Sequence, residues 1–182
     1  MKAALVAGNM AQTEPFNSDA VFASTYQALK AAPEYISQLN RLEKCLNPEI
    51  SMRQSYVDAF QTKDTLWWKN EIHDTDKKIN QEVDPYAKDM YRRIRGFWGI
   101  ACYSLCKQAV SQHNAEALTK IISIYRDLEP ENPDMFYFSS FPAFWKGNNE
   151  ITLSALKKAL KAGFSDRSQL KKDFPESITS KL

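Results

Sequence analysis

The sequence predicts an all-α protein, an array of about nine helices arranged as antiparallel hairpins. Three observations favour this class. Apolar residues recur at the three- and four-residue spacing of one helix face, while the alternation typical of strands is hard to find. Most of the 8 prolines lie between these apolar patterns, where a helix begins or ends. Only 5 of the 182 residues are glycine, so few left-handed turns are expected.

The first half of the chain is predicted to be a series of helices separated by short breaks. Asn17, Ser18 and Asp19 offer N-cap side chains for the second helix. The pair Asn47–Pro48 is expected to end the third, because proline lacks the backbone donor that continues a helix. Residues 62–65 form a break or a cap before the next helix. The predicted ranges are 2–12, 17–31, 34–46, 49–61 and 66–82.

Four helices, the first of them the longest of the chain, are predicted in the second half. Asp84–Pro85 supplies a cap and a first residue for one of them, since proline suits the first helical position. Pro142 predicts a kink, residues 147–149 a tight turn, and Gly163 a helix end. The predicted ranges are 85–112, 115–128, 133–146 and 150–162, with one more short helix expected after Phe164.

Composition argues against several classes of protein. A hydrophobic content of 43% with 25% charged residues is typical of a globular chain. The net charge of +2 is too balanced for a dedicated nucleic-acid binder. No apolar run approaches the roughly 18 residues of a membrane span. The chain has no glycine-rich phosphate loop and no cluster of zinc ligands, so we expect no cofactor and no metal site.

The cysteines bear on the cellular compartment. Their odd count, 3, argues against a disulfide framework. Cys102 and Cys106 lie one helical turn apart and are expected to be reduced and buried. Free thiols suit the cytoplasm. The location stays open, because removal of a signal peptide would instead indicate a periplasmic or exported protein.

Polar residues that could carry chemistry have ordinary explanations. His73 and Asp76 share a helical face, but two ligands do not make a metal site, so a solvated surface is favoured. Cys106 and His113 could form a nucleophile pair, yet no orienting partner is visible. We therefore predict no catalytic residue. A solvated face is also the favoured interpretation of a basic cluster that could instead meet phosphate or an acidic partner: Arg92, Arg93 and Arg95.

The segment 133–166 carries an ordered set of residue types. An aromatic and a small residue precede a turn glycine, and a small residue, a large apolar residue and an alanine follow it. These residues are Phe136, Ser140, Gly147, Thr152, Leu156 and Ala159. In this order the segment resembles the tetratricopeptide repeat (TPR) family. The resemblance implies a single repeat-like domain over residues 1–182, with a degenerate N-terminal hairpin (1–33), an irregular helical middle (34–91), TPR-like hairpins (92–166) and a C-terminal cap or tail (167–182).

Aromatic residues are concentrated between positions 137 and 145. The five are Tyr137, Phe138, Phe141, Phe144 and Trp145. On one helix they would span more than half of the circumference, so some should face a groove or another chain. The resemblance implies that the first helix of each hairpin lines a concave face. We therefore predict that four aromatic residues form the edge of a peptide groove, with core packing as the alternative: Tyr137, Phe141, Phe144 and Trp145.

The predicted function is that of a non-enzymatic interaction module or scaffold, which binds a peptide or helix of an unidentified protein in this groove. One alternative is a helical-bundle enzyme or small-ligand protein with a pocket near Trp67, Trp68 and Trp98. Another is a structural homo-oligomer, in which the aromatic residues seal a homodimer. An open groove lined by first helices would favour the interaction module, whereas a deep, closed cavity would favour the enzyme.

Overall fold

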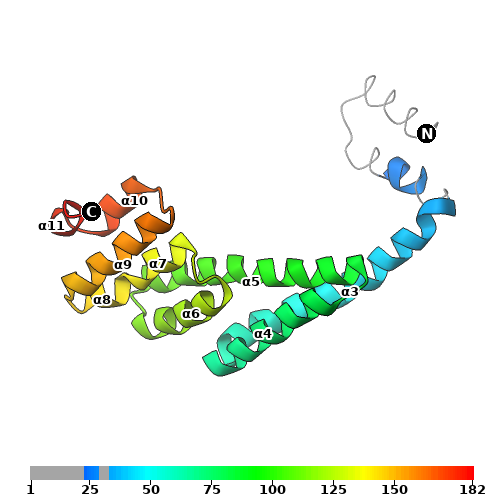
Figure 1. The fold of residues 1–182 in the computed structure, drawn as a ribbon, viewed down its shortest axis with the longest axis horizontal. Coiled ribbons are helices and arrows are strands. Elements are labelled where there is room, and N and C mark those ends of the chain that lie inside the picture. Colours follow the sequence, from blue (N-terminus) through cyan, green and yellow to red (C-terminus); the bar gives the residue numbers. More distant parts are fainter. Residues whose placement is uncertain (1–22, 29–32) are drawn as a thin grey trace, which may run out of the picture. The chain divides into compact units, whose positions relative to one another are not determined.

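The computed structural model of the protein describes residues 23–28 and 33–182. All regular structure in these two ranges is helical, and neither contains a strand. Between Pro33 and Thr179 the chain forms nine helices, α3 to α11 (Figure 1). The all-α class predicted from the sequence is therefore confirmed. The predicted helix over 2–12 and most of the one over 17–31 lie outside the described residues.

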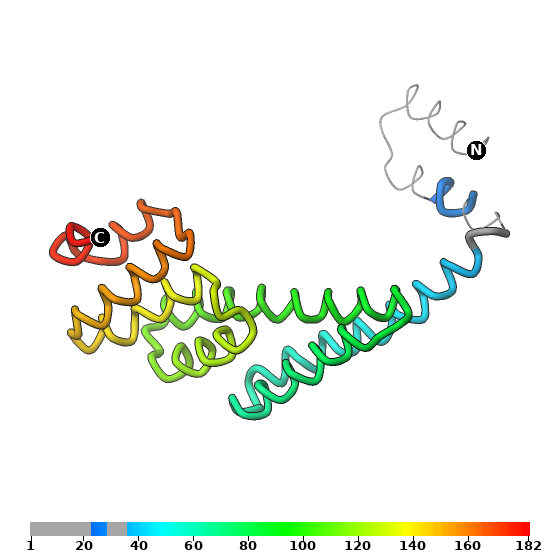
Figure 2. Tube along the Cα trace, viewed as in Figure 1, coloured from blue at the N-terminus to red at the C-terminus, as the bar shows by residue number. Residues whose placement is uncertain are grey.

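The chain divides into two compact units, residues 1–51 and residues 52–182. The division falls inside the segment 34–91, for which the sequence predicted an irregular helical middle. Figure 2 follows the trace of the second unit from its first residues to the C-terminus. Within the described residues, no helix is both long enough and apolar enough to cross a membrane.

Helix α3 corrects one prediction. It runs without interruption from Pro33 to Thr62, and Pro48, which was expected to end a helix, lies inside it. Proline removes one backbone hydrogen bond but keeps a helical φ angle, so it does not by itself force an end. The residues that follow continue the helix to Tyr56 and Phe60, whose burial in the second unit stabilises it.

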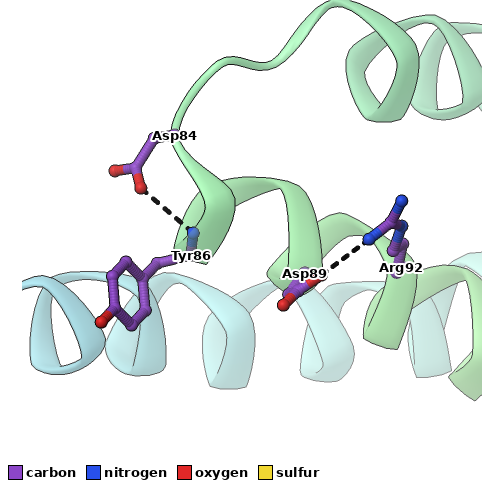
Figure 3. Close-up of polar contacts among 4 residues, drawn as sticks. All are labelled: Asp84, Tyr86, Asp89 and Arg92. Atoms are coloured by element: carbon purple, nitrogen blue, oxygen red, sulfur yellow. Dashed lines mark hydrogen bonds and ion pairs between the residues drawn. The ribbon is translucent and has the colours of Figure 1, made fainter.

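The next two helices begin where their cap residues predict. Helix α4 (Thr65–Gln81) starts after Asp64, whose carboxylate accepts a hydrogen bond from the backbone N–H of Trp67. Helix α5 (Pro85–Ser111) starts after Asp84, which accepts from the N–H of Tyr86 at 3.1 Å (Figure 3). One turn further on, Asp89 and Arg92 form an ion pair at 2.9 Å, also drawn in Figure 3.

The remaining helices are shorter. Helix α6 (Ala115–Leu128) has the predicted bounds and is capped by the Asn114 side chain. The predicted helix over 133–146 is broken at Ser140 into α7 (Pro133–Ser139) and α8 (Phe141–Trp145), as the kink at Pro142 anticipated. Helix α9 (Asn149–Ala162) ends at Gly163 with a φ of 110°, which favours glycine. Two short helices follow, α10 (Arg167–Asp173) and α11 (Glu176–Thr179), where one was expected.

The core of the second unit joins all of its longer helices. Aromatic rings fill the part between α3, α4 and α5: Tyr56, Phe60, Trp68 and Trp98. Further along α5, Cys102 and Cys106 are free thiols with no exposed surface, which confirms their predicted burial. Helix α6 adds mainly isoleucine and leucine side chains, and a second group of aromatic rings lies around α7, α8 and α10.

Candidate binding groove

A hollow of about 440 Å³ lies on the surface of the second unit, bounded by α5, α7 and the segment that includes α10. Helix α5 contributes residues from its last three turns, and α7 contributes residues from both of its turns. The lining residues are Tyr103, Lys107, Val110, Ser111, Asp134, Tyr137, Phe138, Phe164, Asp166, Gln169 and Asp173. The hollow therefore brings together segments that are up to 70 positions apart in the sequence.

The walls of this hollow are aromatic. The ring of Tyr103 meets Phe138 edge-on, with 5.5 Å between centroids. The ring of Phe164 stacks on Tyr137 at 4.6 Å, with only 12° between the planes. Gly163 makes the second pair possible, because its positive φ turns the chain at the end of α9. Tyr137 and Phe138 are thus buried and hold Tyr103 and Phe164, which are the more exposed rings of the walls.

A hydrogen-bond network lies at the α7–α10 side. The Tyr137 hydroxyl donates to Oδ2 of Asp173, and Gln169 Nε2 donates to the same oxygen at 2.6 Å. Burial and the hydrogen bond to Asp173 both raise the pKa of Tyr137 above its ordinary value. The phenol therefore stays protonated at neutral pH and continues to orient the carboxylate.

Three carboxylates line the hollow. Asp166 caps α10, and hydrogen bonds from Ser168 and from the backbone of Gln169 lower its pKa. The pKa of Asp134 is raised by burial and by the nearby Glu129. Among the described residues, the Asp134 carboxylate has no hydrogen-bond or ion-pair partner.

The cation that lines the hollow beside these carboxylates is Lys107. Its Nζ lies 5.8 Å from the centroid of the Tyr103 ring, in a cation–π contact on the same helix. The hollow therefore carries more negative than positive groups, although the whole chain has a net charge of +2.

A second, shallower hollow of about 260 Å³ continues along α5 and shares Tyr103 and Asp134 with the first. Its other lining residues are Gly96, Gly99, Ile100, Tyr125 and Glu129. Ile100 is 70% exposed, so its side chain offers apolar surface in this hollow. Because the two hollows share residues, we treat them as one surface and name it the α5 groove.

A glycine explains how Glu129 comes to line this groove. A Cβ atom on Gly99 would lie 2.7 Å from Oε1 of Glu129, so the missing side chain gives the carboxylate its room. The other oxygen of Glu129 accepts a hydrogen bond from Asn132 Nδ2 at 2.5 Å. Asn132 also caps α7, because its side-chain oxygen Oδ1 accepts hydrogen bonds from the backbone N–H groups of Asp134 and Met135. One asparagine therefore fixes both Glu129 and the beginning of α7, which carries Asp134.

The four predicted groove residues do not lie together on one open surface. Tyr137 lines the α5 groove, but its ring is only 6% exposed. Phe141 is 3% exposed and packs against Phe174 at 4.9 Å. Phe144 is half-buried against the same ring at 5.0 Å, and Trp145 stacks on His113 at 5.3 Å.

These positions correct the expectation of an open aromatic edge. The break at Ser140 separates α7 from α8, so the four residues do not share the side of one straight helix. The C-terminal segment then covers Phe141 and Phe144 through Phe174. Tyr137 and Phe141 are thus part of the hydrophobic core in this structure.

Sequence reasoning missed most of the groove. Asp134 lies at the start of α7, whereas Asp166 and Asp173 lie at the two ends of α10, so nothing in their local sequence distinguishes them from ordinary charged helix residues. A usable signal was present on α5, where Ile100 and Tyr103 are apolar side chains spaced by three on a face that stays exposed.

The other polar candidates are engaged in ordinary contacts. Asp76 accepts a hydrogen bond from Arg95 Nε at 2.6 Å, and Arg95 also donates to the carbonyl of Leu128. His113 occupies the turn after α5 with a φ of 52° and stacks on Trp145. Cys106, its suggested partner, has no exposed surface. The described residues contain no group of three or more His, Cys, Asp or Glu arranged to hold a metal ion.

The tryptophans of the alternative pocket are also packed. Trp68 and Trp98 are fully buried and meet edge-on at 5.5 Å, and Trp67 contacts Trp68 at 5.3 Å. Their ring surfaces are therefore occupied by one another and by their aromatic neighbours.

The fold and the groove together define an all-helical protein with an open, aromatic and acidic surface groove. No known protein family, curated protein or solved structure matches the chain at a significant level.

Proposed function

We propose that this protein is a non-enzymatic interaction module with TPR-like hairpins, which captures a peptide or helix of another protein in the α5 groove. The observation that carries the proposal is the groove itself: an open hollow with aromatic walls, lined by α5, α7 and the α10 segment. It is open at the surface, as a site for a polypeptide must be.

The order of the helices supports the TPR-like part of the proposal. Helix α5 packs against α6, and α7 packs against α9. Each of these two groove-lining helices therefore packs against a helix that follows it in the chain. The family resemblance implies that first helices of successive hairpins line the binding face. Helices α5, α7 and α10 fit that role, with α6 and α9 as the second helices.

Burial at the motif positions adds support. Four residues that matched the family order have no exposed surface: Ser140, Thr152, Leu156 and Ala159. Small residues allow close approach of helices where they cross. The Ser140 hydroxyl is satisfied locally, since it donates to the carbonyl of Tyr137 at 2.6 Å. Gly147 has a positive φ of 73°, as a turn glycine does.

The rigidity of the walls suits recognition. Ring contacts and the Tyr137–Asp173 hydrogen bond hold the groove residues before any partner arrives. A groove that is already formed loses little conformational entropy on binding, so more of the contact energy appears as affinity. A volume of about 440 Å³ accepts a few anchor side chains of a longer segment.

Selection from a peptide library tests this function. A phage-displayed library of random dodecapeptides is selected on the full chain, and the enriched peptides are measured by fluorescence anisotropy. Tyr103 is 38% exposed, so Tyr103→Ala should leave the fold intact. It should weaken binding by about thirtyfold, the effect of losing one aromatic hot spot.

Tyr86→Ala is the matched control, because Tyr86 lies at the other end of α5 and does not line the groove. It should change affinity by less than about twofold. Failure to select any peptide that depends on Tyr103 would contradict the proposed function.

A further inference from the structure

We infer that the occupant of the α5 groove is a basic segment of a partner protein, which inserts a lysine or arginine beside an apolar residue. The inference rests on the proposed function and adds the chemistry of the partner. Charge, exposed apolar surface and aromatic geometry in the groove each contribute to it.

The charge of the groove favours a cation and opposes an anion. Asp134, Asp166 and Asp173 line the deeper hollow, and Glu129 lines the adjoining one. The cation that lines the groove beside these four carboxylates is Lys107, whose ammonium lies over the Tyr103 ring. The surplus of negative charge is local, because the chain as a whole carries +2. An acidic segment would meet like charges here, which costs binding energy.

Several carboxylate oxygens in the groove are available to a partner. Among the described residues, Asp134 has no hydrogen-bond or ion-pair partner, although it is partly buried. Both hydrogen bonds to the Asp173 carboxylate reach Oδ2, which leaves Oδ1 facing no donor in the described chain. A guanidinium or ammonium group would satisfy these oxygens, and a carboxylate already partly desolvated loses less hydration when it binds.

The aromatic walls suit the rest of such a side chain. Lysine and arginine carry an apolar stem below the charged group, and this stem packs against rings. Phe164 stacks on the buried Tyr137 ring and is itself only partly buried, and Tyr103 is 38% exposed, so these two rings leave apolar surface in the groove. The contact of Lys107 with Tyr103 shows that a ring of this groove already holds a cation.

Ile100 supplies the apolar part of the recognition. It is 70% exposed in the shallower hollow, beside Tyr103. A partner residue next to the cation would cover Ile100 and remove apolar surface from water. The groove thus matches a cationic residue and a neighbouring apolar residue in one short segment.

The library selection described above also tests this chemistry. We expect the enriched dodecapeptides to share a Lys or Arg adjacent to an apolar residue. Their affinity should fall as the salt concentration rises from 50 to 300 mM, because salt screens the carboxylates. Replacing the shared basic residue by glutamine should weaken binding by about tenfold or more.

Charge-neutral variants locate the effect in the groove. The double variant Asp134→Asn/Asp166→Asn removes two groove charges. Asparagine is also a good N-cap residue, so the replacement at position 166 can still cap α10. It should bind the selected peptides about tenfold more weakly. The control Asp74→Asn/Asp127→Asn removes two exposed charges that do not line the groove, and it should change affinity by less than about twofold.

The results that would overturn the inference are distinct from a failure of the proposed function. Enrichment of acidic or uncharged peptides that still depend on Tyr103 would overturn the basic partner and leave the interaction module standing. Equal losses in the two double variants would show a general effect of net charge. Self-association of the chain alone, abolished by Asp134→Asn/Asp166→Asn, would make a second copy the occupant instead. If no peptide is selected at all, both proposals fail.

Discussion

Two glycines of α5 provide a matched pair of substitutions. Gly96 and Gly99 lie less than one turn apart in the interior of the same helix, and neither has a positive φ. A Cβ atom on Gly96 would meet nothing within 4 Å. On Gly99 it would lie 2.7 Å from Oε1 of Glu129. The pair therefore separates backbone preference from the cost of moving Glu129.

Replacement of Gly96 by alanine should raise the free energy of unfolding by about 1 kcal/mol, because glycine is the poorer helix former by that amount. Gly99→Ala has the same gain, but the Glu129 carboxylate must move away from the new methyl group. That movement strains the hydrogen bond from Asn132, and a hydrogen bond to a charged group contributes about 1.5 to 3 kcal/mol. We expect Gly99→Ala to be less stable than Gly96→Ala by about that amount.

Urea denaturation followed by far-ultraviolet circular dichroism measures both variants. The midpoint should shift upwards for Gly96→Ala at an unchanged slope, which indicates a change in stability alone. For Gly99→Ala the midpoint should lie at or below that of the parent chain. Equal stabilisation of the two variants would refute the close approach of Glu129 to α5.

Four further predictions concern residues of the same unit. Phe141→Ala should lower the free energy of unfolding by about 3 to 5 kcal/mol, because its side chain is buried. Trp145→Ala should lower it clearly less, because the Trp145 ring is half-buried. Equal losses of the two variants in urea denaturation would contradict this difference in burial. Tyr137→Phe should cost about 1.5 to 3 kcal/mol through loss of its bond to a carboxylate, and no loss in the same assay would argue against that bond. Cys102 and Cys106 should react with a thiol reagent at pH 8 far more slowly in the native chain than in denaturant, with fast native labelling as the opposing result. Burial raises the pKa of the Cys106 thiol from 9.0 to about 12, so the free energy of unfolding should fall as pH rises across that interval, and a flat dependence in a titration of stability would disagree.

Features set by neighbouring residues were predicted well from the sequence. Asp84 precedes α5 as expected and α6 has the predicted bounds, because a cap side chain needs only a backbone N–H two or three residues ahead. Gly163 ends α9 for an equally local reason, since only glycine takes its φ without strain.

Features that depend on distant residues were not predicted. Pro48 stays inside α3, where burial of Tyr56 and Phe60 outweighs the lost hydrogen bond. The groove is a stronger case, because Asp134 and Asp173 become neighbours only after the helices between them have folded. Spacing along one helix carries no information about such an approach.

The C-terminal end of α3 is capped by Lys120, a residue that is synthesised much later than the helix itself. Its Nζ donates to the carbonyl oxygens of Phe60 and Gln61, at 3.0 and 3.4 Å, and so caps a helix whose last turn has no basic residue of its own. The cap and Phe60 are 60 positions apart. At a translation rate of about 5 to 20 residues per second, the end of α3 waits roughly 3 to 12 seconds for this lysine to be made. In a growing chain the carbonyl oxygens of Phe60 and Gln61 therefore lack this donor for that interval, and they gain it only when α6 has been made.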